Sequence, residues 1–231
     1  MQDDSSSWAQ RQFGHAFARP ELLRTALTHR SAGARHNERL EFLGDSVFNC
    51  AVARLLFDAF PAADEGTLSR QRAILVSGES LARIAAQHGV GEHLKLGGGE
   101  LRTGGFRRAS ILADALEALI GAVLLDAGFE AASAAVRRLV EPQLAQLPDD
   151  AALKDPKTRL QEALQAEGHA LPEYSLTASG GEDHRKWFEV RCEVAALGLA
   201  ADGSGESRRR AEQSAAERVL ALLPARARRG V

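Results

Sequence analysis

Cysteine is almost missing from this sequence of 231 residues, since only Cys50 and Cys192 occur and they lie in different halves of the chain. Two cysteines placed so far apart argue against a disulfide framework and against a cysteine metal site. We therefore predict that both are buried thiols.

Long hydrophobic runs are absent as well. No stretch reaches the about 18 apolar residues that a membrane-spanning helix needs, and the polar start MQDDSSSWAQ lacks the basic and apolar regions of a signal peptide. These absences predict a cytoplasmic protein that is not exported and has no membrane partner. At 45% hydrophobic and 26% charged residues, the composition is that of a globular protein, and the length suits two domains.

The sequence also has little excess charge of either sign, with a formal net charge of −2. Residues 1–153 carry 16 basic and 19 acidic side chains, and residues 154–231 carry 13 basic and 12 acidic ones, so neither half has the positive charge typical of a nucleic-acid binder. The last 25 residues differ, because seven arginines stand there against only Glu212 and Glu217. This segment is either a basic patch for an anionic partner or merely a soluble basic tail.

Helical periodicity dominates the first half of the chain, so we predict an all-α N-terminal domain over residues 1–147. Five helices are predicted, one each in PELLRTALTHRS, RLEFLGDSVFNCAVARLLFDAF and RASILADALEALIGAVLLDAG and two in EGTLSRQRAILVSGESLARIAAQHG. Pro61 and Gly89 mark two of their ends, and Gly128 is the predicted stop of the last and most apolar helix. The glycine-rich LGGGELRTGG predicts a loop.

The stretch LPDDAALKDP, rich in Asp and Pro, predicts a linker over residues 148–154. Beyond it, one helix (KTRLQEALQAEG), three strands (EYSLTAS, KWFEVRCEV and GLAADGSG) and a closing helix (SRRRAEQSAAERVLALL) predict an α+β domain of α-β-β-β-α order over residues 155–224. Such a domain can form a three-stranded antiparallel sheet covered on one face by two helices. Residues 225–231 remain as a basic tail.

Three acids share one face of a predicted helix in the stretch NERLEFLGDS. Glu38, Glu41 and Asp45 are three, four and seven positions apart, which places them within a sector of about 60° on a helix. Like charges this close disfavour the helix by about 0.2–0.5 kcal/mol per pair, so we expect a cation to compensate them. The competing interpretation is the solvated acidic edge of an ordinary amphipathic helix.

A second acidic pair, Asp114 and Glu117, lies in the apolar stretch SILADALEALIGA. Unpaired buried carboxylates are costly, so these acids need a cation, a proton or hydrogen-bond donors. If this helix packs against the earlier one, Glu41 and Asp45 complete a cluster of four carboxylates. Hard oxygen ligands in that number favour Mg²⁺ or Mn²⁺ over zinc. Two such ions would stabilise the attacking water and the leaving oxygen in phosphodiester hydrolysis.

Three arginines, Arg208 to Arg210, open the closing helix behind Gly203 and Gly205. Cations at a helix N-terminus oppose the helix dipole, so they destabilise the helix unless an anion such as phosphate binds there. This arrangement favours a phosphate contact, and a solubilising cap is the alternative.

With these motifs in view, the sequence resembles the bacterial ribonuclease III family, whose members cut double-stranded RNA. Three blocks match in order and spacing: NERLEFLGDS, DEGTLSRQRAILVS and LGGGELRTGGFRRASILADALEALIGAVLLD. The C-terminal half resembles a double-stranded-RNA-binding domain, so the resemblance covers almost the whole chain. It implies an endoribonuclease that gives 5′-phosphate products with short 3′ overhangs. It also implies processing of ribosomal RNA precursors and of other structured transcripts, messenger and transfer RNA among them.

The resemblance implies a metal-binding set of four carboxylates: Glu41, Asp45, Asp114 and Glu117. The implied cofactor is Mg²⁺, with Mn²⁺ expected to substitute, and no small-molecule cofactor is implied. Within this set, the resemblance implies that Asp45 and Glu117 are the catalytic residues. Glu38 and Glu65 are similar to supporting acids that line the cleavage valley in the family.

The resemblance further implies a homodimer in which the signature helix packs against its twin. Phe42 and Leu43 then point away from the acids and are buried either in the partner or in the core of their own chain. A duplex-RNA-binding regulator without catalysis is the rival from another class of function. That rival would lack metal ligands, and all four acids are present.

Seven side chains of the second domain match RNA-contacting positions of the family: Gln161, Glu162, Gln165, His184, Arg208, Arg209 and Arg210. The helix that carries the two glutamines and Glu162 would enter one minor groove, and the loop that carries His184 would enter the next. The arginines would bind phosphates. Such contacts recognise A-form shape and 2′-hydroxyls rather than base sequence. An exposed polar helix face and a surface loop are the competing interpretations.

Two departures from the family's pattern affect the strength of RNA binding. Arginines stand at the phosphate-gripping positions where the family has lysines, which changes the donor geometry. Glu182 and Asp183 place negative charge beside His184. In the matched blocks of the first domain, we interpret His29 as structural, whereas Arg107 and Arg108 either contact phosphates or form a salt bridge at the start of a helix.

Overall fold

The computed structural model describes residues 2–147, 155–182 and 185–223. The chain divides into two compact units, Met1–Leu147 and Pro148–Val231. The predicted linker 148–154, His184 and the predicted tail 225–231 lie outside the described residues, so the predicted domain limits stay predictions. Within the described ranges, no helix combines the length and the apolar character that crossing a membrane requires.

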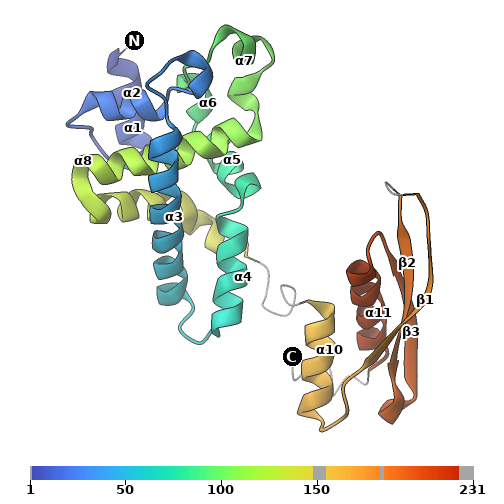
Figure 1. Cartoon of the computed structure of the whole chain (residues 1–231). Coiled ribbons are helices and arrows are strands. Elements are labelled where there is room, and N and C mark those ends of the chain that lie inside the picture. The colour runs from blue at the N-terminus through green and yellow to red at the C-terminus, as the bar shows by residue number, and fades with distance from the viewer. Residues whose placement is uncertain (1, 148–154, 183–184, 224–231) are drawn as a thin grey trace. The chain divides into compact units, whose positions relative to one another are not determined.

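The first unit consists of helices, which confirms the predicted all-α class (Figure 1). Its elements are α1 Gln2–Phe13, α2 Pro20–Ala26, η1 Arg30–Ala32, α3 Glu38–Ala59, α4 Glu65–Leu75, α5 Gly78–Gln87, α6 Val90–His93, α7 Gly98–Arg102, η2 Gly105–Arg107 and α8 Ala109–Leu144. Side-chain caps explain two of the starts, because Asp64 accepts a hydrogen bond from the Thr67 amide and Ser77 accepts one from the Ser80 amide. The long apolar α8 is packed in the centre of the core, as its sequence predicted.

Three details of this unit differ from the sequence predictions or extend them. The segment LGGGELRTGG is not a simple loop, because α7 forms one helical turn within it. The predicted stop at Gly128 is a sharp break, with φ 85° and ψ 179°, after which the chain resumes a helix to Leu144. Helix α1 was not predicted, since its sequence is polar apart from Trp8, Ala9 and Phe13, which all enter the core.

The prediction of two buried thiols is correct for Cys192 and wrong for Cys50, which is exposed. Cys50 lies about half a turn from both Phe48 and Val52, which are buried on the core face of α3. A single small apolar residue within a long helix carries too little information to tell which face it occupies.

A buried carboxylate fixes the start of α2 against α8. The Asp126 side chain is only 1% exposed. It accepts hydrogen bonds from His15 Nε2 at 2.7 Å, from the Ala18 amide at 2.9 Å and from the Arg19 amide at 3.0 Å. Burial opposes the ionised form, but these hydrogen bonds outweigh it and hold the pKa of Asp126 below its usual value.

We expect Asp126→Ala to lower the free energy of unfolding of the first unit by about 3 kcal/mol at pH 7, because four donors, Arg19 Nε among them, lose their charged acceptor. The folded-state pKa is lowered, so the stabilisation is present above the unfolded pKa of about 4 and is lost as pH falls through the folded value. Thermal and urea unfolding at pH 7 and pH 3 would measure both effects. Asp58→Ala is the control, since the exposed Arg54–Asp58 pair is expected to contribute less than about 1 kcal/mol.

The second unit has the predicted α-β-β-β-α order. Its elements are α10 Pro156–Ala166, β1 Glu173–Gly180, β2 Trp187–Val194, η3 Ala195–Leu197, β3 Leu199–Gly205 and α11 Arg208–Leu222. The antiparallel strands lie in the order β1-β2-β3, with an irregularity between Leu176 and Ala178. Leu160 of α10 and Val219 of α11 share one core with Cys192 of β2, so both helices cover the same face of the sheet.

Candidate metal centre and RNA-binding surface

Two glycines bring α3 and α8 close together where the acids lie. A Cβ at Gly44 would collide with the carbonyl oxygen of Glu117, and one at Gly121 would collide with the carbonyl oxygen of Leu40. Because neither position has a side chain, the two backbones can touch, and the helices cross as Figure 1 shows. This close crossing carries the acids of α3 to the acids of α8.

Glu41, Asp114 and Glu117 meet at the crossing. Each offers one carboxylate oxygen, and the three oxygens lie within 4.8 Å of one another. All three side chains are half-buried. In the described part of the chain, no other group of three or more carboxylate, histidine or cysteine side chains brings its ligand atoms so close together.

The fourth predicted ligand, Asp45, is not a member of this close group. Its side chain is exposed, and its Oδ1 accepts a hydrogen bond from Asn49 Nδ2 at 2.8 Å. It lies near enough to act on the cluster electrostatically, since its charge contributes to the raised pKa of Glu117. The predicted metal set therefore has three members together and one beside them.

Burial and mutual repulsion make the ionised cluster unfavourable without a cation. Burial, followed by the charge of Asp45, raises the pKa of Glu117 to about 7. Burial and the charge of Asp114 raise the pKa of Glu41, and burial raises the pKa of Asp114 itself. A divalent cation would relieve this repulsion, and an all-oxygen donor set suits Mg²⁺ or Mn²⁺. The residues present fit such an ion.

A cavity of about 410 Å³ adjoins the cluster and has charges of both signs on its wall. Arg30 Nη1 lies 3.4 Å from Glu38 Oε1, so the predicted supporting acid Glu38 has a cationic neighbour. Arg108 Nη1 lies 2.8 Å from Glu100 Oε2. That ion pair favours the salt-bridge interpretation of Arg108 over a phosphate contact.

His29 and Arg107 have local partners. His29 precedes η1, where its Nδ1 lies 2.8 Å from Ser31 Oγ and its amide donates to the Lys95 carbonyl. These contacts support a structural role, although His29 also lies on the wall of the cavity. The Arg107 guanidinium lies 4.9 Å from the centre of the Phe106 ring.

Glu65 and Phe42 lie on the surface of the first unit. Glu65 begins α4, and its Oε1 accepts a hydrogen bond from Ser69 Oγ at 2.8 Å. It is not on the wall of the cavity beside the cluster. Phe42 is 79% exposed, so the interpretation of Phe42 as core of its own chain is wrong. The exposure of a large aromatic side chain beside a charged site therefore needs an explanation other than packing within its own chain.

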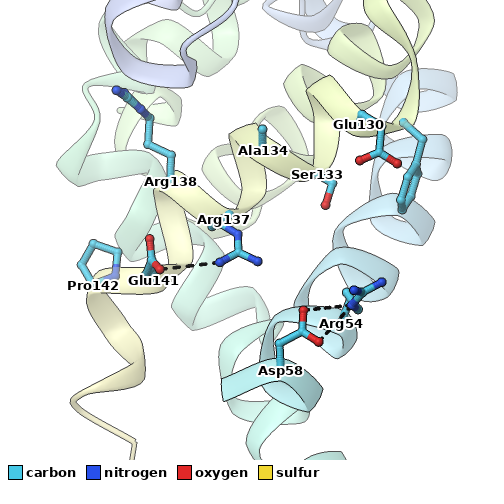
Figure 2. Close-up of a pocket in the computed structure, with 10 residues that line it drawn as sticks. Arg54, Asp58, Glu130, Ser133, Ala134, Arg137, Arg138, Glu141 and Pro142 are labelled. Atoms are coloured by element: carbon cyan, nitrogen blue, oxygen red, sulfur yellow. Dashed lines mark hydrogen bonds and ion pairs between the residues drawn. The ribbon is translucent and has the colours of Figure 1, made fainter. Parts of the chain in front are cut away.

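A larger hollow, of about 770 Å³, lies between α3 and the part of α8 beyond Gly128 (Figure 2). Arg54 Nε lies 2.9 Å from Asp58 Oδ2, and Arg137 Nη1 lies 3.8 Å from Glu141 Oε1. Its cations are thus largely matched by acids, and among the described residues that line it no cluster of metal-binding carboxylates forms. The smaller cavity, which adjoins the carboxylate cluster, is therefore the better candidate for a metal-binding site.

Apart from His184, which lies outside the described residues, the predicted RNA-contacting residues of the second unit lie on α10 and α11. Gln161 and Gln165 are exposed on α10, and Glu162 between them is half-buried. Their exposure agrees both with groove contacts and with an ordinary polar face. Arg208 and Arg209, in the first turn of α11, each have an acidic partner, with Glu212 at 3.0 Å and Asp155 at 3.5 Å.

Sequence reasoning missed the carboxylates that hold these arginines. The Arg208–Glu212 spacing of four on a helix is a recognised pairing signal that could have been used. No spacing rule connects Asp155 with Arg209 or Lys157 with Glu212, because each pair is more than fifty positions apart.

Comparisons with known proteins agree with this architecture. A family described as Ribonuclease-III-like matches residues 19–144, and a Double-stranded RNA binding motif matches residues 156–223. Ribonuclease 3 of Thiobacillus denitrificans is 58% identical over 214 residues, which cover 93% of this chain and 95% of that protein. Ribonuclease 3 of Aromatoleum aromaticum is 54% identical over 214 residues, covering 93% and 95%.

Solved structures resemble the first unit. The nuclease domain of ribonuclease III from Campylobacter jejuni is 41% identical, with a TM-score of 0.58, and the match covers 62% of this chain and 97% of that one. A second structure of that domain, concerned with structural flexibility in a region involved in dimer formation, is 42% identical with a TM-score of 0.57, covering 60% and 97%.

Proposed function

Since the chain belongs to the ribonuclease III family, we propose that this double-strand-specific endoribonuclease holds divalent metal ions on the carboxylates where α3 and α8 cross. Glu41, Asp114 and Glu117 form the centre of the site, and Asp45 completes it from the exposed edge. The observation that carries the proposal is the approach of three half-buried carboxylate oxygens to within 4.8 Å. Mg²⁺ is the proposed ion, with Mn²⁺ able to substitute.

When bound, such ions supply Lewis-acid stabilisation for in-line hydrolysis of a phosphodiester by water. The chain contributes a preorganised and half-buried set of oxygens, so little rearrangement is needed when the ion and the RNA arrive. Glu117, with its pKa raised to about 7, is readily ionised once a cation replaces its proton. We assign the catalytic roles to Asp45 and Glu117, with Glu38 and Glu65 as supporting acids of the cleavage valley.

The proposed products are fragments with 5′-phosphates and short 3′ overhangs, because water attacks phosphorus while the 3′-oxygen leaves. An overhang requires one cut in each strand, and a homodimer would supply two sites for them. The exposed Phe42 beside the acids supports a partner surface on α3. The proposed targets are precursors of ribosomal RNA and other structured transcripts in the cytoplasm.

Incubating the purified protein with a long RNA duplex tests this proposal. With Mg²⁺ we expect short fragments whose 5′ ends carry phosphate, no cutting after chelation, and no cutting of a DNA duplex of the same sequence. Products with 5′-hydroxyl ends, or cutting that persists in a chelator, would contradict the metal-dependent mechanism.

The second unit is proposed to supply affinity for the duplex through Gln161, Glu162, Gln165, His184 and the arginines of α11. Deleting residues 154–231 should leave cutting at low salt, because the metal centre lies wholly in the first unit. At about 0.15 M salt we expect kcat/KM to fall on the order of 10²-fold, since phosphate contacts are lost. Single-turnover cleavage over a salt series measures this. Equal activity of both proteins at that salt would make the second unit dispensable.

A further inference from the structure

Glu212, which is not among the proposed RNA-binding residues, connects the two helices of the second unit. Its Oε1 accepts a hydrogen bond from Arg208 Nε at 3.0 Å, and its Oε2 accepts one from Lys157 Nζ on α10 at 2.5 Å. The Glu212 side chain is only 13% exposed. One carboxylate thus connects the first turn of α10 with the first turns of α11.

The partners of Glu212 are held as well. The Lys157 ammonium lies 4.5 Å from the centre of the Tyr174 ring, so it has an aromatic contact in addition to its ion pair. The hydrogen bond from Lys157, ahead of the one from Arg208, lowers the pKa of Glu212 against the effect of burial. Glu212 is therefore ionised and fixed between two cations.

Arg208 is bound at one side of its guanidinium and open at the other. It donates to Glu212 through Nε, and its side chain is 61% exposed. Within the described residues, neither of its Nη groups has a protein partner. A guanidinium whose outer nitrogens are open can bind two phosphate oxygens at once. The bond to Glu212 restrains the orientation of this guanidinium.

Asp155 connects the same two helices a second time. It caps α10 by accepting a hydrogen bond from the Lys157 amide at 2.9 Å, and its Oδ2 accepts one from Gln213 Nε2 at 2.7 Å. Arg209 Nη2 lies 3.5 Å from the same oxygen. The phosphate-gripping end of α11 is thus tied to the start of the helix that carries Gln161.

We propose that Glu212 is a positioning residue for duplex RNA, which aims the Nη groups of Arg208 at phosphates and keeps α11 in register with α10. The inference rests on the proposed RNA-binding function. In an A-form duplex, the distance from a minor groove to the phosphates across the next major groove is fixed, so two helices held at one spacing favour RNA over DNA. Glu212 thus strengthens binding through the position of Arg208, although Glu212 and the RNA are both negatively charged.

The test compares Glu212→Gln with Glu217→Gln in the full chain. Both changes remove one negative charge from α11, but Glu217 is exposed. Binding is measured in a chelator with RNA and DNA duplexes of about 30 base pairs, longer than the about 16 base pairs that one such domain spans. We expect Glu212→Gln to weaken RNA binding about tenfold. The slope of log K against log salt concentration should fall in magnitude by about 0.9, and the ratio of RNA affinity to DNA affinity should decrease. Glu217→Gln should bind as tightly as the unmutated chain or more tightly.

Tighter RNA binding by both variants would overturn the proposal, because Glu212 would then act only as a repelling charge. Arg208→Lys provides a second measurement that keeps the charge and removes the Nε donor. It should weaken binding by itself, and adding Glu212→Gln to it should weaken binding little further; additive effects would show that the two residues do not act together. An unmutated chain that did not bind duplex RNA would instead contradict the proposed function.

Discussion

Replacing Glu117 by Gln is expected to abolish cleavage of duplex RNA while leaving binding of the duplex intact. The change keeps the size of the side chain but removes a charged ligand from the centre of the carboxylate group. Metal stabilisation of the transition state is worth several kcal/mol, and about 1.4 kcal/mol corresponds to a factor of ten in rate. We therefore expect a loss of at least about 10³-fold in single-turnover rate with Mg²⁺, and an unchanged Kd for the duplex.

Stability provides an independent readout of the same substitution. Because burial raises the pKa of Glu117 from 4.5 to about 7, ionising this group destabilises the metal-free fold. That destabilisation is absent below the unfolded pKa, grows as pH rises toward the folded value, and is complete above it. Metal-free Glu117→Gln should thus melt at a higher temperature than the unmutated protein at pH 8, with a smaller difference at pH 5.

Glu130→Gln is the matched control, since Glu130 lies on α8 at the distant hollow that Figure 2 shows. It should change neither the cleavage rate nor the response of the melting temperature to Mg²⁺. Cleavage by Glu117→Gln at a rate close to that of the unmutated protein would remove Glu117 from the catalytic role.

The spacing of residues was sufficient to predict which acids share a face of each helix. It did not predict that the acids of the two helices come together. Glu41 and Asp45 are four apart, and Asp114 and Glu117 are three apart, so the face that each pair shares follows from helical geometry. Their approach depends on Gly44 and Gly121, whose missing side chains let two backbones touch. A glycine within a helical pattern indicates only reduced helix propensity; which partner backbone it admits is a tertiary property.

Other features were beyond sequence reasoning for similar reasons. The exposure of Cys50 depends on which face of α3 meets the core. Asp45 lies outside the close group with an exposed side chain that is hydrogen-bonded to Asn49, which is a tertiary detail that spacing does not predict. The α-β-β-β-α order of the second unit was predictable, because alternating strands and a linker rich in Asp and Pro leave strong local signals.

Substituting Phe42 by Asp is expected to dissociate the proposed homodimer. Phe42 leaves 79% of its surface exposed in the single chain, and burying a phenylalanine is worth about 1.5–3 kcal/mol. A two-fold interface buries the residue of both copies, so we expect Kd for dimerisation to rise by about three orders of magnitude, before the repulsion of two new carboxylates is counted. Sedimentation velocity over a concentration series would measure this change.

The functional consequence follows from the position of Phe42 next to Glu41. If the ring packs against a partner, the two carboxylate clusters lie on either side of that contact, and one duplex can meet both. Phe42→Asp should then lose coordinated cutting of the two strands and yield nicked duplexes at concentrations where the unmutated protein releases short fragments. Phe129→Asp is the control, because Phe129 is 42% exposed at the distant hollow and its substitution should leave both the mass and the products unchanged. A Phe42→Asp protein that stayed dimeric and still released short fragments would show that this ring is not the contact between copies.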